Sequence, residues 1–347
     1  MQEAWPITLV HLGTAVPPYL KDCVHQLRLW SPAATGNSRI YIVLEPVHRD
    51  ASGQPTSFWA SLVEKYAVEL RYTDELEPTP EHIAFRNSYK GDTAFRKGYW
   101  RHVKERFFFM EELMIKEGLP DMIAMEYDVL LYSPIELVAG HLRQYAKGRL
   151  AFVMDTDVRG HPGFMFIGSP GVMHALNDCF MQLATKPFED MQTLAIFKAH
   201  YPDYVATLPV MIPQRRLAKP GSRYSISGEG CTDATFLSDG FDETGCLFDS
   251  LSIGQLLGGV DPRNSSGQDT LGYINETALY SPLEMEIAWA KVGPSLWIPM
   301  LDGAPLVTIH MHSKALAPFL SDRETVPMAS ADDVAAVWQT LEPNELV

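Results

Sequence analysis

Two short, almost uninterrupted runs of apolar residues near the start of the chain constrain its fold most strongly. "ITLVHLG" (7–13) ends at a glycine, and "RIYIVLEP" (39–46) ends at a proline. Between them, "PPYLKDCVHQLRLW" (17–30) carries apolar residues at helical spacing, which predicts strand, helix and strand within about forty residues. Because both runs are continuously apolar rather than alternating, we expect a parallel sheet that is covered on both faces.

The alternation of strand and helix continues along the chain. "SFWASLVEKY" (57–66) and "RHVKERFFFMEELMIKEG" (101–118) predict helices. Further strands are predicted at 67–73, 121–134, 149–158, 162–170 and, after an irregular region from about 185 to 280, at 305–316. This order is typical of a Rossmann-like α/β/α sandwich with a mainly parallel central sheet. We expect one domain over 1–322, with halves at about 1–135 and 136–322, and a peripheral helix or tail at 323–347.

Composition narrows the possible partners and locations. Lys and Arg number 28 against 43 Asp and Glu, and this net charge of -15 argues against nucleic acid or an anionic membrane surface as the main partner. No stretch approaches the roughly 18 apolar residues of a membrane span, and the first residues do not resemble a signal peptide. The cysteines form no CxxC pair, which favours reduced thiols in a cytoplasmic protein; they are Cys23, Cys179, Cys231 and Cys246.

An acid-x-acid triplet lies within the predicted strand "DMIAMEYDVLLYSP" (121–134). Residues i and i+2 of a strand point to the same face, so Glu126 and Asp128 can converge on one cation. Strand ends of open α/β sheets are also where ligands bind. Taken alone, such a common triplet favours a cap or surface ion pair at Glu126 and a turn at Asp128, so the metal-site hypothesis needs a partner elsewhere in the chain.

The late strand "LVTIHMHSKAL" (306–316) supplies candidate partners. His310, His312 and Lys314 follow one another at the period of a strand, so all three side chains can face one way. Two carboxylates joined by an imidazole from His310 or His312 suit Mn²⁺ and tolerate Mg²⁺ less well. The Lys314 ammonium could neutralise a diphosphate that such a metal holds.

Together these features resemble the GT-A glycosyltransferases. The resemblance rests on the N-terminal α/β half, the "EYD" triplet, the "PGFMFIG" strand (162–168) and "HMHSK" (310–314), and it covers roughly residues 7–316. It implies a nucleotide-binding half at about 1–135 and a sugar and acceptor half at about 136–322. It also implies a hexosyltransferase-like enzyme that uses a nucleoside-diphosphate-sugar donor and a carbohydrate, glycoconjugate or protein acceptor. The triplet begins with Glu where Asp is more usual in that superfamily.

The resemblance also implies roles for individual residues. His11 and Gly13, at the end of the first strand, would lie near the base and ribose of the donor, and Arg106 would reach the donor sugar. Asp249 and Asp261 are the candidate catalytic residues, because an inverting reaction needs a general base at the acceptor hydroxyl. In a retaining reaction the same carboxylate would only orient the substrate.

Three other classes of protein share parts of this pattern. A metal-dependent hydrolase could use the HxH pair, although HxH here comes last in the chain and no HExxH accompanies it. A sugar-1-phosphate nucleotidyltransferase would need a glycine-rich phosphate loop, which "HLGTAVPPY" (11–19) does not supply. A non-catalytic module that binds a nucleotide sugar would keep the fold and the binding residues without turnover.

Overall fold

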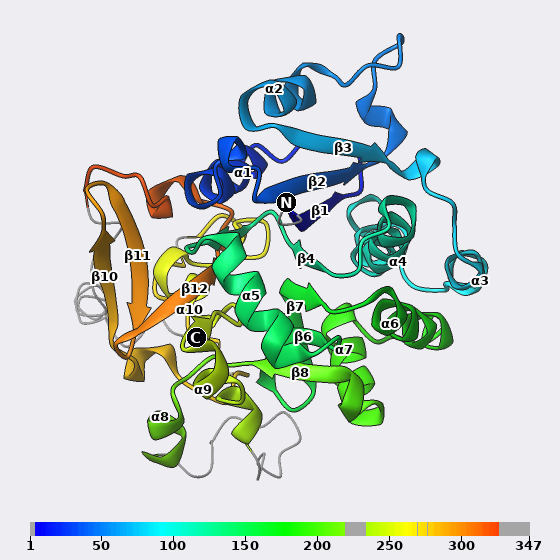
Figure 1. Cartoon of the computed structure of the whole chain (residues 1–347). Coiled ribbons are helices and arrows are strands. Elements are labelled where there is room, and N and C mark those ends of the chain that lie inside the picture. Colours follow the sequence, from blue (N-terminus) through cyan, green and yellow to red (C-terminus); the bar gives the residue numbers. More distant parts are fainter. Residues whose placement is uncertain (1–3, 219–233, 269, 276, 326–347) are drawn as a thin grey trace.

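The computed structural model describes residues 4–218, 234–268, 270–275 and 277–325. A seven-stranded sheet forms the centre of the molecule, in the order β3-β2-β1-β4-β7-β6-β8 (Figure 1). All neighbouring pairs are parallel except those that β7 makes with β4 and β6. The strands are β1 Trp5–His11, β2 Ser38–Leu44, β3 Val68–Tyr72, β4 Met122–Met125, β6 Leu150–Thr156, β7 Arg159–Ile167 and β8 Val205–Leu208. The predicted α/β class and mainly parallel sheet are confirmed.

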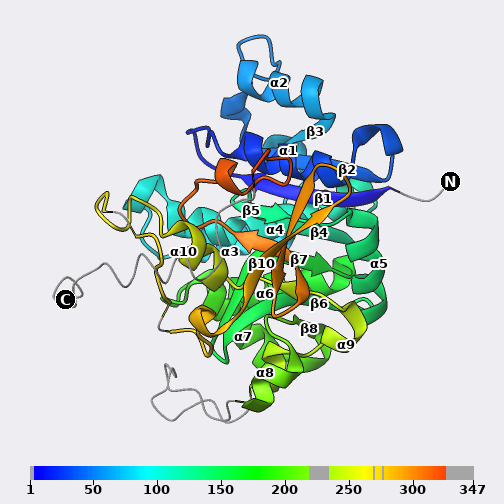
Figure 2. The same cartoon turned by 90° about the vertical axis from the view of Figure 1, so that its left-hand side faces the viewer.

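Helices cover both faces of this sheet (Figures 1 and 2). On one face α5 begins beside the end of α1, where the Ile135 amide donates to the Ser31 hydroxyl at 3.0 Å. On the other face α4 and α6 pack together, and the Asn177 side chain donates to the Phe107 carbonyl at 3.1 Å. The longer helices are α1 Leu20–Trp30, α2 Ser57–Tyr66, α3 Pro80–Ser88, α4 Tyr99–Glu117, α5 Ile135–Ala146, α6 Pro170–Gln182 and α7 Asp190–His200. The shorter ones are α8 Pro213–Ala218, α9 Phe241–Thr244 and α10 Ser252–Gly258.

A second, smaller sheet stands beside the first and follows the order β10-β11-β12-β5. Its strands are β5 Val129–Leu131, β9 Leu247–Phe248, β10 Ile287–Val292, β11 Leu296–Leu301 and β12 Ala304–His310, with β9 parallel to β12. The antiparallel register of β12 and β5 sets His310 opposite Val129. The end of β12 therefore lies next to Asp128, although 182 positions separate Asp128 from His310.

Two of the predicted strands are shorter than expected. The predicted strand 121–134 is two strands in different sheets, because the chain turns at 126–128, where the Glu126 carbonyl accepts the Val129 amide at 3.1 Å. The predicted strand 306–316 ends at His310, and Lys314 has a φ of +66°. The side chains of His310, His312 and Lys314 therefore do not share one strand face, and the period-2 argument for them was wrong.

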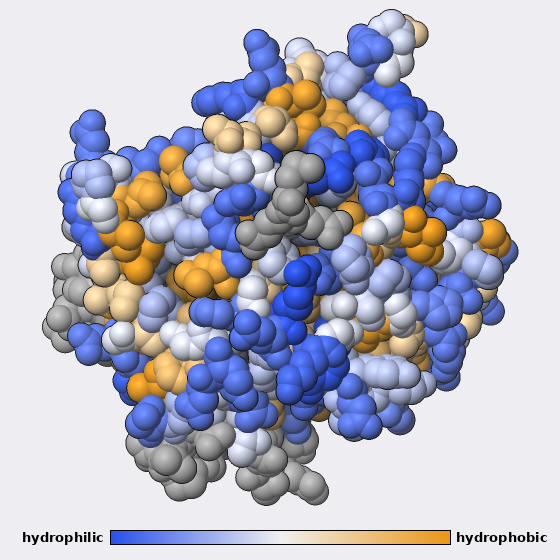
Figure 3. Space-filling view, viewed as in Figure 1, coloured by the Kyte–Doolittle hydropathy of each residue, from blue (hydrophilic) through white to orange (hydrophobic). Residues whose placement is uncertain are grey.

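The surface and the ends of the chain add three findings. The face seen in Figure 3 is largely hydrophilic, and hydrophobic side chains gather over the β10–β11 hairpin. Within the described residues, no helix is long and apolar enough to cross a membrane. Cys23, Cys179 and Cys246 are free thiols, whereas Cys231 and most of the predicted C-terminal tail lie outside the described residues.

Candidate active site

Glu126 and Asp128 occupy the short connection between the two sheets. Glu126 follows the last residue of β4, and its amide donates to the Gly163 carbonyl of β7 at 2.9 Å. Asp128 precedes β5, and its carbonyl accepts the Met311 amide at 2.8 Å. Both carboxylates thus lie at the carboxyl ends of the parallel strands, where α/β sheets bind their ligands.

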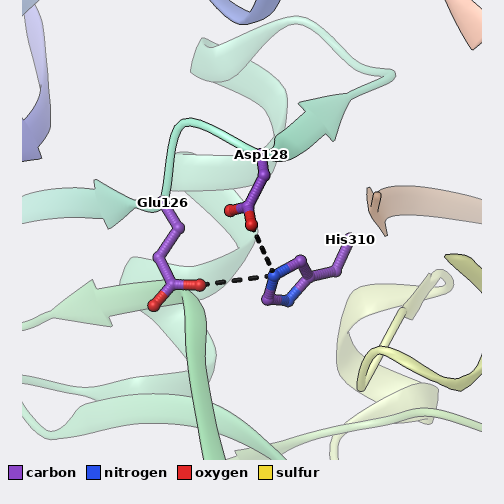
Figure 4. A group of neighbouring side chains, drawn as sticks. All are labelled: Glu126, Asp128 and His310. Atoms are coloured by element: carbon purple, nitrogen blue, oxygen red, sulfur yellow. Dashed lines mark ion pairs between the residues drawn. The ribbon is translucent and has the colours of Figure 1, made fainter. Parts of the chain in front are cut away.

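These two carboxylates meet the imidazole of His310 (Figure 4). Nε2 of His310 lies 3.3 Å from a carboxylate oxygen of Glu126 and 3.3 Å from one of Asp128. One ligand atom from each of the three residues lies within 4.8 Å of the others. Asp128 and His310 are buried and Glu126 is half-buried. Two carboxylate oxygens and one imidazole nitrogen are a donor set that suits a divalent transition metal such as Mn²⁺.

Two cationic side chains flank the three candidate ligands. Lys314 forms an ion pair with Asp128, and Arg106 of α4 forms one with Glu126. Burial alone would raise the pKa of the Asp128 carboxyl, but Lys314 and His310 outweigh it and hold this pKa well below its usual value. Burial would also raise the pKa of Glu126, but the charges of Arg106, His310 and Lys314 together lower it. Both groups are therefore carboxylates, the form that binds a metal.

Arg106 also holds a third buried carboxylate, which the sequence analysis did not identify. Its Nη2 donates to Asp190 at 2.7 Å, so one guanidinium bridges the acidic triplet and the start of α7. Asp190 is 7% exposed. The only sequence signal was an acid in the first turn of a helix, which is common without any function because it complements the helix dipole.

Asp249 fixes the position of His310 through the backbone. Its Oδ2 accepts the amides of His310 and Gly254, both at 2.9 Å, and its Oδ1 accepts the Ile253 amide at 2.9 Å. Three backbone donors thus satisfy this buried carboxylate, which is the environment expected of a residue that organises a strand end and a helix start. Its candidate role as catalytic base stays a prediction from the sequence.

Two glycines leave the space that His310 occupies. A Cβ on Gly163 would lie 2.7 Å from Nδ1 of His310, and a Cβ on Gly254 would lie 1.9 Å from the His310 carbonyl oxygen. Ordinary van der Waals contact begins at 3.4 Å, so side chains at these positions would collide with the ring and with its backbone. The lack of a side chain at both positions therefore defines where the imidazole lies.

His312 lies apart from the three candidate ligands. Its Nδ1 accepts the Asp261 amide at 3.0 Å, which ties the turn after β12 to the loop after α10. Burial, together with the charges of Lys314 and His310, lowers the pKa of His312 to about 4, so its imidazole is neutral at pH 7. The Asp261 carboxylate accepts from Nε of Arg263 at 3.0 Å. Of the two histidines in HxH, it is His310 that joins the candidate metal ligands.

His11 is the last residue of β1 and lies beside Tyr127 of the acidic triplet, and Gly13 follows two residues later. Nδ1 of His11 is 3.2 Å from the Tyr127 hydroxyl, and its ring packs against His48 and Trp59 with centroids 5.2 and 5.6 Å away. Burial and the neighbouring His48 lower the pKa of His11 to about 4. Gly13 has a φ of +110°, a conformation that favours glycine. His11 therefore lies close to the triplet, and the contacts of His11 and Gly13 with the base and ribose stay a prediction from the sequence.

Comparison with known proteins gives a likeness of fold only. No protein-family model matches the chain, and no curated protein matches it. The apo form of mouse xyloside xylosyltransferase 1 is 11% identical over 61% of this chain and 89% of its own, with a TM-score of 0.41. The apo WbbM bifunctional glycosyltransferase is 12% identical over 60% of this chain and 39% of its own, with a TM-score of 0.38. The apo glycosyltransferase GlyE of Streptococcus pneumoniae is 11% identical over 59% and 45%, with a TM-score of 0.34.

All three of these solved proteins are named as glycosyltransferases or as a xylosyltransferase. This chain spans most of the first and less than half of the other two. Because the identities and TM-scores are low, what this chain does has to be inferred from its own side chains.

Proposed function

We propose that the protein is a metal-dependent glycosyltransferase that moves a sugar from a nucleoside-diphosphate-sugar donor to an acceptor. One observation carries this proposal. Glu126, Asp128 and His310 converge at the carboxyl edge of the parallel sheet, with ligand atoms within 4.8 Å of one another. A cation on either side of them, Lys314 and Arg106, provides the positive charge that a diphosphate needs.

The departing group of such a donor is a nucleoside diphosphate, whose negative charge must be stabilised as the glycosidic bond breaks. When bound, a divalent metal supplies Lewis-acid stabilisation of that charge. Glu126, Asp128 and His310 would hold the metal, and the Lys314 ammonium would turn from Asp128 to a phosphate oxygen. Arg106 keeps Glu126 and Asp190 in place. It remains our candidate for a contact with the donor sugar.

The two candidate catalytic carboxylates receive different roles in this proposal. Asp249 positions His310, since both of its oxygens already accept backbone amides. Asp261 accepts hydrogen bonds from the guanidinium of Arg263, which is exposed. Because Asp261 lies beside this exposed side chain, we assign the acceptor side of the site to Asp261. His11 and Gly13 remain our candidates for contacts with the base and ribose.

The hydrolase alternative draws less support from the same geometry. It needs both histidines of HxH on one metal, whereas His312 accepts the Asp261 amide through Nδ1. A non-catalytic nucleotide-sugar-binding module differs from an enzyme only in turnover, so the experiment below measures binding and transfer separately.

Calorimetric titration tests the proposal. Nucleoside diphosphates and nucleotide sugars are titrated with and without Mn²⁺ into the wild type and Asp128→Ala. We expect Mn²⁺-dependent binding of one nucleotide in the wild type and at least a tenfold weaker affinity in the variant, because one metal ligand and the partner of Lys314 are lost. Release of free nucleoside diphosphate from the bound nucleotide sugar then separates an enzyme from a binding module.

Asp203→Ala is a matched control, since Asp203 is exposed and precedes β8. It therefore lies at the amino end of this strand, whereas the candidate metal ligands lie at the carboxyl ends. This variant should bind the nucleotide as the wild type does. If the wild type binds no nucleotide with or without Mn²⁺, the glycosyltransferase proposal fails and the hydrolase becomes the better hypothesis.

A further inference from the structure

The segment before and at the start of α4 has a charge opposite to that of the protein as a whole. Residues 86–106 hold seven lysines and arginines but only two carboxylates, in a chain with a net charge of -15. Within this segment Phe95, Arg96, Lys97 and Tyr99 are exposed. We name these four residues, together with Arg263, the cationic rim.

The backbone of the rim has an unusual and well-supported conformation. Arg96 and Lys97 have φ values of +45° and +58°, and Gly98 follows at +92°. Non-glycine residues rarely adopt positive φ, and where they do the conformation is held by its surroundings. Here Asp92 accepts the amides of Ala94 and Phe95 at 2.7 and 3.1 Å. The result is that two adjacent cationic side chains are presented outside the regular helix.

One face of α4 connects the rim to the candidate metal ligands. Tyr99, His102 and Arg106 are spaced by three and four residues, so they lie along the same side of the helix. Seven residues of helix span about 10 Å, which sets the distance along α4 between the rim and the guanidinium that binds Glu126. The rim is therefore the outer border of the site.

The loop after α10 closes this border from the other side. Nη2 of Arg96 donates to the Asn264 side chain at 3.0 Å, and Figure 2 shows the two segments side by side, cyan and yellow. Arg263 lies in the same loop and is exposed, with its guanidinium on Asp261. The loop that carries Asp261 and Arg263 thus contacts the α4 side of the rim directly, through the bond from Arg96 to Asn264.

The rim combines two exposed cations, Arg96 and Lys97, with the partly exposed aromatic rings of Phe95 and Tyr99. In the part of the chain that the structure describes, no carboxylate forms an ion pair with Arg96 or Lys97. Phe95 and Tyr99 are each 40% exposed. The Phe95 ring stacks on Trp100 with centroids 5.7 Å apart, and the Arg96 guanidinium lies 5.0 Å from the centre of the Phe95 ring. Flat aromatic surfaces can pack against the apolar faces of sugar rings, and guanidinium groups bind carboxylates and phosphates.

We propose that the cationic rim binds the acceptor, and that this acceptor is an anionic carbohydrate, a glycan that carries carboxylate or phosphate groups. The inference rests on the proposed glycosyltransferase function and names the acceptor class that the function leaves open. In the proposed function, Lys314 and the candidate metal ligands already bind the diphosphate of the donor. The rim lies one helix segment further out, on the side of the Asp261 loop, where an acceptor would approach.

A nucleic acid would offer the same charges and rings, but its phosphates would meet the strongly acidic remainder of the protein. A short anionic glycan touches only the rim and is spared that repulsion. For this reason the glycan is the occupant that we propose, and a nucleic acid is one of the outcomes that the experiment can detect.

The test measures binding of four tetrasaccharides in the absence of nucleotide. The probes are tetragalacturonate with its neutral counterpart galactotetraose, and phosphorylated mannotetraose with unmodified mannotetraose. We expect at least one anionic probe to bind about tenfold more tightly than its neutral parent at low ionic strength, with the preference fading as salt screens the exposed charges. The two pairs distinguish a carboxylate from a phosphate ligand.

The variant R96Q/K97Q should lose this preference and keep the wild-type affinity for nucleotide and Mn²⁺. A control with the same change of charge, Lys65→Gln with Lys186→Gln, alters exposed lysines elsewhere and should keep the preference. The inference is overturned if no anionic probe binds better than its parent, if R96Q/K97Q retains the preference, or if it weakens nucleotide binding equally. Tighter binding of a short single-stranded RNA than of every glycan would overturn it as well. Because the glycans are measured without nucleotide, these results are separate from failure of the nucleotide titration.

Discussion

Gly163→Ala gives the sharpest test of how the site is built. The new Cβ would lie 2.7 Å from Nδ1 of His310 and 3.2 Å from a methyl group of Val129. Since ordinary contact begins at 3.4 Å, the imidazole has to move by about 0.7 Å or the strands have to separate. Metal–ligand distances tolerate only about 0.2 Å, so a shift of the whole ring carries Nε2 too far to complete the metal site.

We therefore expect the Mn²⁺ affinity of Gly163→Ala to fall by about 10- to 100-fold, the usual effect of disturbing the group that orients a metal ligand. The overpacked β7 should also lower the free energy of unfolding by about 1–3 kcal/mol. Calorimetric Mn²⁺ titration measures the first effect, and urea unfolding followed by circular dichroism measures the second.

Gly140→Ala is the matched control, because a Cβ there meets nothing within 4 Å and the residue lies inside α5. It should leave Mn²⁺ binding unchanged and raise the free energy of unfolding by up to about 1 kcal/mol. If Gly163→Ala binds Mn²⁺ within twofold of the wild type, the reasoning about the space around His310 is refuted.

Two further predictions concern buried charges. His82 donates to Glu112 at 2.6 Å and contacts Glu105 at 3.2 Å; burial lowers its pKa, but these two hydrogen bonds outweigh burial and raise it. The stabilisation is complete below the unfolded pKa of about 6.5 and is lost as pH rises through the higher folded pKa. Urea unfolding should therefore show that the difference in free energy of unfolding between the wild type and His82→Gln shrinks between pH 5.5 and 9. An unchanged difference would contradict this. Arg106→Met leaves Glu126 and Asp190 without the cation that they share. The free energy of unfolding, measured by the same urea unfolding at pH 7, should therefore fall by about 3–5 kcal/mol. A loss below about 1 kcal/mol would disprove the bridging role of Arg106.

The fold class and the central ligands could be predicted from the sequence, since both depend on local patterns. Apolar runs predicted the parallel strands, and "EYD" and "HMHSK" predicted the residues that meet in the candidate metal site. The contact itself depends on the pairing of β12 with β5, which no local pattern specifies.

The residues that the sequence analysis missed or misplaced act through the three-dimensional packing. Asp190 joins the site through Arg106, and Gly163 matters only because His310 packs against it. His312 was expected on the same strand face as His310, but β12 ends at His310, two residues earlier, and the turn that follows directs His312 to the Asp261 amide. Strand ends are where period-2 reasoning is least secure, because the turn that follows abolishes the alternation.

The position of the acidic triplet has a consequence for the stability of the whole chain. Glu126 directly follows β4 of the large sheet, while Asp128 directly precedes β5 and His310 ends β12 of the small sheet. An ion bound by all three residues would cross-link the two sheets, so the sheets could not separate without releasing the ion. Its binding free energy would then add to the resistance against unfolding, by about 2.7 kcal/mol when the ion is present at a hundred times its dissociation constant. Heat resistance of this protein would therefore depend on the supply of the ion in its surroundings.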